Sequence, residues 1–252
     1  AFTGTKIFTS LSPAWTRLGL FGLDTESADA PKLVHAVVTR EAPGISIAED
    51  WNTLGMRASQ SNTTHLTSVV AASDRVFRRL DPGPSRDALI FAIFANFEIL
   101  ISSVYVGIGQ RALELAVESA RSRGSRKTGL GRDQDPNVRW KIADAALAQD
   151  AMLPQLDALA VDLDSGVDRG AEWFRALVGL KSRSTRTARY VVDQAIAVAG
   201  GAAFSATSEL SRLYRDVLAG GFHPSNDDSV HSTVATALLG PIIEDPSPTL
   251  RS

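Results

Sequence analysis

Glu98 is the first candidate for acid–base chemistry, because it is the only acidic residue in the apolar run of residues 88–109. Burial among apolar side chains disfavours a charged carboxylate. It therefore raises the pKa and suits the group to act as a general base near neutral pH. A structural alternative stays open, since a buried glutamate can pair with an arginine or cap a neighbouring element. We predict that Glu98 is catalytic, with the structural role as the alternative.

His223 is the second candidate and lies in the glycine-flanked segment Gly221–Asp228. The ordinary pKa of histidine is close to neutrality, so its ring can donate or accept a proton under physiological conditions. The alternative is a histidine that only occupies a surface turn. Asn226 and Asp227 are predicted to cap the helix that follows, and a base role for Asp227 is the lesser alternative.

The composition limits the other kinds of site. The 252 residues include no cysteine, which excludes disulfides, thiolate metal sites and a cysteine nucleophile. This composition fits a reducing compartment, and we expect a cytoplasmic location. A formal net charge of −2 gives no sign of a nucleic-acid partner. The remaining histidines lack the spacing of metal ligands, so we predict no metal site: His35, His65 and His231.

Residues 1–82 are expected to form a β domain. Three short runs rich in Val, Leu, Thr and aromatic residues are separated by turn-forming residues, and they are Leu18–Leu23, Leu33–Thr39 and Thr64–Val70. Several short strands in series predict an antiparallel sandwich or barrel. The chain begins at Ala1 without a methionine or a leader segment, and Gly4–Phe8 is typical of a turn that enters a strand. We therefore expect the chain to begin inside a domain.

Residues 83–243 are expected to form a helical bundle, so the fold class is α+β. The boundary is Asp81–Ser85, where two prolines and a glycine stop both strand and helix. Helices are predicted from Ser85 or Asp87 to about Arg123, from Asp135-Pro136 to Ser165-Gly166, over Ala171–Ala199, over about Ser208–Leu218, and from Asn226 or Asp227 to about Gly240. Residues 244–252 are predicted to be an unstructured tail.

The first of these helices has two unusual features. Its apolar run is about long enough to cross a bilayer, but Asn96 and Glu98 near the middle favour a core helix and no membrane span. Because it is apolar nearly all round, we expect it at the centre of a bundle or of an oligomer interface. Gly107–Ala112 fits the G-x-G-x-x-A dinucleotide pattern, but no βαβ unit surrounds it. Close helix packing is the preferred interpretation.

Five short motifs, in this order, resemble the acyl-CoA dehydrogenase superfamily of flavoproteins: Lys6–Ser10, Leu54–Ser59, Arg126–Thr128, Ala199–Gly201 and Arg215-Asp216. The resemblance implies that Lys6–Ser10 is a strand, and that its Thr9 and Ser10 lie against a flavin ring. It also implies that Arg126 reaches the cofactor pyrophosphate of a neighbouring subunit, and that Gly200 and Gly201 lie at the dinucleotide. The implied cofactor is FAD, with FMN as the alternative. The implied assembly is a homotetramer or dimer of dimers that uses acyl-CoA or another small substrate, with an electron-transfer partner possible.

The positions at which this chain departs from the family pattern lead to different hypotheses about its function. Many members carry Tyr-Glu-Gly-Thr in the loop after Arg-Asp, and that glutamate is the base. Here the loop contains His223 and no glutamate. The family's N-terminal helical domain is also missing from this chain. The first hypothesis is an FAD-dependent acyl-CoA dehydrogenase in which a base such as Glu98 removes the α-proton and flavin N5 accepts the β-hydride.

Two further hypotheses follow from the same loop. In the reduced-flavin monooxygenase branch of the superfamily, a histidine in this loop and a serine on the β domain hydrogen-bond the activated flavin or a phenolic substrate. His223 and Ser10 could fill those two places. The third hypothesis is a non-catalytic subunit that has lost its base and supports an active partner.

Overall fold

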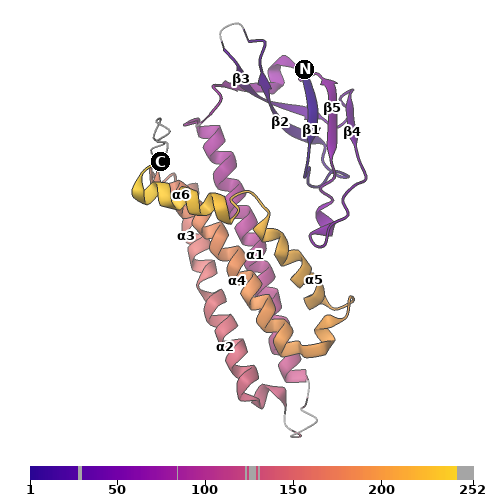
Figure 1. The fold of residues 1–252 in the computed structure, drawn as a ribbon, viewed down its shortest axis with the longest axis vertical. Helices are drawn as coiled ribbons and strands as arrows, with labels where there is room; N and C mark the ends of the chain where they lie inside the picture. The colour runs from indigo at the N-terminus through magenta and orange to yellow at the C-terminus, as the bar shows by residue number, and fades with distance from the viewer. Residues whose placement is uncertain (28–29, 84, 123, 125–128, 130, 243–252) are drawn as a thin grey trace, which may run out of the picture. The chain divides into compact units, whose positions relative to one another are not determined.

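The computed structural model divides the chain into two compact units, residues Ala1–Ala92 and Ile93–Ser252, and each is considered by itself. The structure describes all residues except 28–29, 84, 123, 125–128, 130 and 243–252 (Figure 1). The predicted domain limits of 1–82 and 83–243 stay a prediction.

The first unit is a sandwich of two three-stranded antiparallel sheets. One sheet has the order β1-β5-β4 (Phe2–Lys6, Thr64–Val69, Ile45–Ile47), and the other has the order β2-β3-β6 (Arg17–Asp24, Lys32–Thr39, Val76–Leu80). Leu20 and Val38 from one sheet pack with Leu66 and Val69 from the other, and all four side chains are buried. The alternation of inward and outward residues therefore produces one shared core. The predicted antiparallel sandwich is confirmed.

The three predicted strands are observed to within one residue, but the segment that resembles the family's flavin strand is not a strand. β1 ends at Lys6, before Thr9 and Ser10. Phe8 and Leu11, beyond the paired residues of β1, have φ angles of 56° and 57°, which lie in the left-handed region. Thr9 and Ser10 therefore lie in a looped segment, and the expectation of a strand there is wrong.

The second unit contains most of α1 (Ala88–Ser122), whose residues up to Ala92 belong to the first unit. Among the described residues it also contains α2 (Pro136–Asp150), α3 (Met152–Asp164), α4 (Glu172–Ala199), α5 (Glu209–Val217) and α6 (Asp227–Leu239). Five short 3₁₀ turns connect elements of the chain: η1 (Arg57–Ser59), η2 (Ser73–Arg75), η3 (Arg132–Gln134), η4 (Gly200–Phe204) and η5 (Leu218–Gly221). α4 packs against α2, α3, α5 and α6, so α4 is the central helix of the unit (Figure 1).

Local sequence signals explain the helix ends. Asp135 caps α2, and its carboxylate accepts a hydrogen bond of 2.8 Å from the backbone N–H of Asn137. The single helix predicted from Asp135 to Gly166 is wrong, because α2 ends at Asp150 and α3 begins at Met152. Pro154 has no N–H to donate to the carbonyl of Asp150, which disfavours an unbroken helix at this point.

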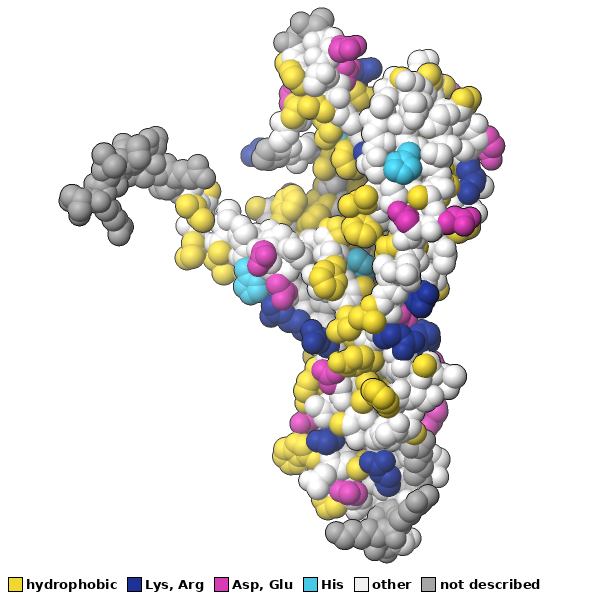
Figure 2. Space-filling view, turned by 45° about the vertical axis from the view of Figure 1, so that its right-hand side comes forward, with side chains coloured by type: hydrophobic (Ala, Val, Ile, Leu, Met, Phe, Trp, Pro, Cys, Tyr) yellow, Lys and Arg dark blue, Asp and Glu magenta, His cyan; other side chains and the backbone are white. Residues whose placement is uncertain are grey.

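α1 buries one face and exposes the other. The buried face includes Glu98 and Tyr105, whereas Ile93 and Leu100 on the opposite face are 54% and 62% exposed. Figure 2 shows such hydrophobic side chains on the surface. The expectation that α1 is covered on all sides is therefore not met within this chain, and its burial in an oligomer stays a prediction. By length and composition α1 could also cross a membrane, but one such helix is weak evidence.

The two glycines of the Gly107–Ala112 pattern behave differently. A Cβ added at Gly109 would collide with the side chain of Gln149 on α2, whereas a Cβ at Gly107 would meet nothing within 4 Å. Gln149 also donates a 2.9 Å hydrogen bond to the carbonyl of Val106. Close helix packing is thus the role of Gly109 only, and the helical setting leaves no dinucleotide-binding turn here.

Candidate active site

Glu98 and His223, 125 residues apart in the sequence, belong to one buried polar cluster of the helical unit. Tyr105 and Ser225 connect them: Tyr105 hydrogen-bonds His223, and Ser225 hydrogen-bonds Glu98. Lys181 on α4 hydrogen-bonds the same loop. The fold thereby gathers a carboxylate, a phenol, an ammonium and an imidazole around the segment of residues 220–225, which we call the 220–225 loop.

The imidazole of His223 is fixed by Tyr105. The phenol oxygen lies 3.2 Å from Nδ1 of His223, and the two rings meet edge to face with centroids 5.9 Å apart. Tyr105 is fully buried. Burial and the negative charge of Asp216 raise the pKa of the Tyr105 phenol, so the phenol keeps its proton and can donate it to Nδ1.

The direction of this hydrogen bond and the tautomer of His223 depend on each other. If Nδ1 accepts from Tyr105, the hydrogen of the neutral ring is on Nε2. Burial, together with the positive charge of Lys181, lowers the pKa of His223, which favours the neutral ring. His223 can therefore present an N–H donor from Nε2 without carrying a full charge.

Glu98 is engaged inside the bundle. It is 1% exposed, and Oε1 accepts a short hydrogen bond from the hydroxyl of Ser225. Its Oε2 atom is buried and has no hydrogen-bond partner among the described residues. Burial raises the pKa of Glu98, while the Ser225 hydrogen bond and the charge of Lys181 act in the opposite direction. These contacts favour the structural alternative, and catalysis by Glu98 stays a prediction.

Lys181 is the member of the cluster that sequence reasoning missed. It is 2% exposed, although lysine is almost never fully buried without partners. A signal was present: Lys181 falls on the helical stripe formed by the buried residues Leu177, Ser184 and Ala188 of α4. A lysine on the apolar face of a helix must either be buried with that face or interrupt it.

The residues predicted to face a flavin in the first unit surround a polar patch. The backbone N–H of Thr9 donates to the carbonyl of Asn62 at 3.3 Å, and the hydroxyls of Ser10 and Ser61 are 2.9 Å apart. Apolar side chains near them in the same segments are more than half exposed, and they are Ile7, Phe8, Leu11 and Leu54. Exposed apolar surface beside hydroxyl groups suits a flat aromatic ring with a polar edge.

Gly200 and Gly201 end α4 at a distance from His223. Gly200 has a φ of 66° and caps the helix, as a C-terminal glycine is expected to do. Lys181 lies nineteen positions earlier on α4, which corresponds to roughly 28 Å along the helix axis. The nucleotide-binding role of the two glycines stays a prediction. Arg126, the fifth predicted cofactor residue, lies outside the described residues.

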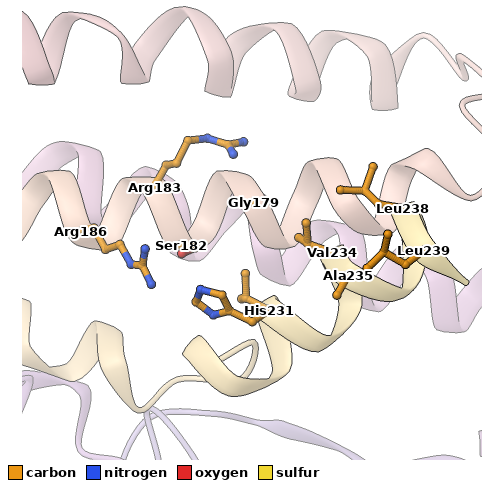
Figure 3. Close-up of a pocket in the computed structure, with 10 residues that line it drawn as sticks. Gly179, Ser182, Arg183, Arg186, His231, Val234, Ala235, Leu238 and Leu239 are labelled. Carbon is orange, nitrogen blue, oxygen red and sulfur yellow. The ribbon is translucent and has the colours of Figure 1, made fainter. Parts of the chain in front are cut away.

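A separate hollow of about 510 Å³ lies between α4 and α6, away from the polar cluster. Val234, Leu238 and Leu239 form its apolar end, and His231 and Arg186 lie at the other end (Figure 3). Arg186 forms an ion pair of 3.1 Å with Asp227. None of the predicted site residues lines this hollow. Among the described residues, no three metal-binding side chains are close enough to hold an ion.

An antiparallel sandwich followed by a helical bundle, with Arg215-Asp216 before a partly buried loop, defines a protein of the acyl-CoA dehydrogenase fold. The family described as "Acyl-CoA dehydrogenase, C-terminal domain" matches residues 99–228, which is more than half of the chain. The chain therefore belongs to this family, and the resemblance found in the sequence is confirmed.

Three proteins are similar to this chain over most of its length. The L-evernosamine nitrososynthase of Micromonospora sp. is 30% identical over 87% of this chain and 52% of its own length. The isobutylamine N-hydroxylase of Streptomyces viridifaciens is 30% identical over 88% of this chain and 54% of its own length. The X-ray structure of KijD3 with FMN and a dTDP-linked amino sugar has a TM-score of 0.77 and 27% identity, and the match covers 97% of this chain and 60% of that one. The chain thus spans about half the length of the curated relatives it matches.

Proposed function

We propose that this chain is the flavin-binding and histidine-bearing part of a flavin-dependent monooxygenase that oxygenates the nitrogen of a small amine. The observation that carries the proposal is His223. It occupies the loop after Arg215-Asp216, its ring is fixed by Tyr105, and the loop contains no glutamate. A neutral N–H donor suits the stabilisation of charge on oxygen, whereas α-proton abstraction needs a free carboxylate.

The named relatives support this class of reaction. A nitrososynthase and an isobutylamine N-hydroxylase are both named for oxidation at nitrogen. FMN and a dTDP-linked amino sugar are bound in the KijD3 structure, so FMN is proposed here before FAD. A homotetramer or dimer of dimers stays part of the proposal.

The side chains around Ser10 fit the ring of a flavin and its polar edge. The exposed apolar side chains around Ser10 could cover the ring, and the hydroxyl of Ser10 could bind its polar edge. A reduced flavin supplies two electrons, so that one oxygen atom of O₂ enters the substrate and the other leaves as water. His223 would hold a proton at Nε2 for the reacting oxygen, and Tyr105 would keep the ring in that tautomer.

Dehydrogenation of an acyl-CoA is the second candidate, because burial raises the pKa of Glu98 as a general base requires. Its near-complete burial and its bond to Ser225 count against this function. A base must come within hydrogen-bond reach of the proton it removes.

The experiment supplies the purified protein with photoreduced FMN, O₂ and isobutylamine or a dTDP-linked amino sugar. We expect a product heavier by one oxygen atom, detected by mass spectrometry. His223→Asn should lower product formation about a hundredfold, the scale of a lost acid–base group. His231→Asn on the exposed face of α6 is the matched control and should change the rate little.

The same preparation tests the alternatives. Bleaching of the oxidised flavin by an acyl-CoA without O₂, abolished by Glu98→Gln, would establish a dehydrogenase and reject our proposal. A protein that binds no flavin and acts only together with a homologous subunit would instead support the non-catalytic role.

A further inference from the structure

Lys181 directs its hydrogen bonds to a single segment of the chain. Its ammonium group donates to the carbonyls of Gly220 at 2.8 Å, Ser225 at 3.0 Å and His223 at 3.4 Å. An ammonium has three N–H donors, so this set accounts for all of them. Burial of a charge is costly unless such partners are present. A neutral side chain at position 181 would leave three loop carbonyls without their donor.

The far end of the 220–225 loop is held from α1. Ser225 has a φ of 57°, a left-handed conformation that is unfavourable for a residue with a side chain. Its hydroxyl donates to Glu98, while its carbonyl accepts from Lys181. Strained backbone persists only where surrounding contacts determine it, and here the contacts come from two different helices.

The start of the loop is held by close packing. A Cβ added at Gly220 would lie 2.8 Å from the side chain of Thr185 and 3.1 Å from that of Tyr105. Only glycine permits this approach of the backbone to α4 and α1. His223 therefore lies between two restrained positions, Gly220 and Ser225, and Tyr105 restrains its ring.

We infer that Lys181 and Glu98 are positioning residues: they hold the 220–225 loop from α4 and α1, and so place the imidazole of His223 against Tyr105. Neither is needed to touch the substrate. The consequence for catalysis rests on the proposed function of His223, whereas the restraint of the loop does not.

Lys181 also affects the charge of His223. The positive ammonium adds to the effect of burial in lowering the pKa of His223. Burial lowers the pKa of Lys181, and the charges of Glu98 and Asp227 act in the opposite direction. On the other side of the ring contact, the charge of Asp216 adds to burial in raising the pKa of Tyr105. Removal of the ammonium should therefore raise the pKa of His223 and loosen the loop at once.

The test compares Lys181→Met with Lys141→Met on α2, which removes the same charge away from the loop. Hydrogen–deuterium exchange follows the amides of Phe222 and His223, which donate to the carbonyl of Ala219 at 3.0 and 3.2 Å. We expect about tenfold faster exchange at these amides in Lys181→Met. NMR titration should show a higher pKa for His223, and the oxygenation kcat should fall more than the amine KM changes.

Two further variants keep the test decisive. Ser225→Ala removes only the hydrogen bond to Glu98 and keeps the ammonium. It should speed exchange at the same two amides and so tests the restraint of the loop if Lys181→Met does not fold. The chain contains no cysteine, so Lys181→Cys, alkylated with bromoethylamine in urea and refolded, restores an ammonium at this position alone. It should recover the slow exchange and the low pKa of His223, whereas alkylation with iodoacetamide should not.

Unchanged loop exchange and an unchanged His223 pKa in a folded Lys181→Met protein would overturn the inference. If both loop readouts change as expected but the unsubstituted protein forms no oxygenated product, the proposed function fails and the positioning role of Lys181 stands.

Discussion

The two units bury polar groups of different kinds. Among the described residues of the β unit, the buried polar side chains include no Asp, Glu, Lys or Arg, and they are Thr9, Ser12, His35, Ser61, Asn62 and Thr64. The helical unit buries Glu98 and Lys181 together with neutral groups. Charged partners make stronger hydrogen bonds but cost more to desolvate. The described interior of the β unit thus lacks buried acids, lysines and arginines, whereas the helical unit holds its 220–225 loop with buried charged groups.

The difference has a cause in the backbone. In the β unit, Asn62 accepts from the N–H groups of Asp50 and Trp51 at 3.0 and 2.8 Å and donates to Ser12. The neutral side-chain amide of Asn62 is sufficient to bind the backbone of these neighbouring loops, which are exposed to water. The 220–225 loop instead contacts buried helix surface, where water cannot satisfy its carbonyls, and an ammonium with three donors replaces the water.

The largest effect on stability is expected from Glu98→Ala. It removes the acceptor of Ser225, leaves a cavity and takes away the negative charge near Lys181. We expect the free energy of unfolding to fall by roughly 3 kcal/mol in urea titrations. Glu98→Gln keeps an acceptor and should cost less. Equal losses in the two variants would show that charge is unimportant in this unit.

A pair of serine substitutions compares the units directly. Ser225 donates to a carboxylate, and Ser10 shares a hydrogen with the neutral hydroxyl of Ser61. Ser225→Ala should lower the free energy of unfolding by about 2 kcal/mol, and Ser10→Ala by under about 0.5 kcal/mol. Thermal and urea unfolding give both values. A larger loss for Ser10→Ala would reverse the comparison.

Asn62→Ala tests the neutral network of the β unit. It leaves two backbone N–H groups without their acceptor and should cost about 1.5 kcal/mol. Asn52→Ala is the control, because Asn52 is exposed in the neighbouring loop, and should change the stability by under about 0.5 kcal/mol. Similar costs for the two variants would mean that the hydrogen bonds of Asn62 add nothing to stability.

The smallest effect is a dependence on pH in the helical unit. The pKa of His223 is lower in the folded state than its ordinary value of 6.5. Stability from the neutral ring is therefore present above pH 6.5 and is lost as the pH falls through the folded pKa. Glu98, whose pKa is raised, acts in the opposite direction.

Comparison with His223→Gln separates the two groups, since Glu98 is common to both proteins. Between pH 7.5 and 5.5, the unsubstituted protein should lose up to about 1 kcal/mol more than His223→Gln. Parallel stability curves for the two proteins would show that His223 is not buried in its neutral form.

Residue composition along the chain, together with turn-forming and helix-ending residues, was sufficient to predict most of the fold. Residues 18–23, 33–39 and 64–70 are rich in strand formers and are separated by turn formers, and glycine ends α4 at Gly200. Such signals act over a few residues, so they can be recognised without knowing which element the segment packs against. β4 and β6 were missed because strands of three and five residues carry little pattern. The break at Ala151 was missed because the apolar period continues through Pro154.

Only two of the four titratable residues of the polar cluster could be predicted from the sequence. Glu98 and His223 were found because each stands out from its own neighbours. Lys181 and Tyr105 were missed, because the one looks like a solvated helical lysine and the other like a core aromatic residue. Nothing within α1 or α4 alone indicates that the 220–225 loop lies against both.

The sequence by itself determined the fold class, the family and the identity of the histidine loop, because these depend on local patterns and on motifs in fixed order. The tertiary structure alone decided that Glu98 contacts Ser225, that Lys181 binds three loop carbonyls and that Tyr105 hydrogen-bonds His223. These contacts join residues up to 127 positions apart. Their energies arise from burial and charge, which exist only once α1, α4 and the loop have packed.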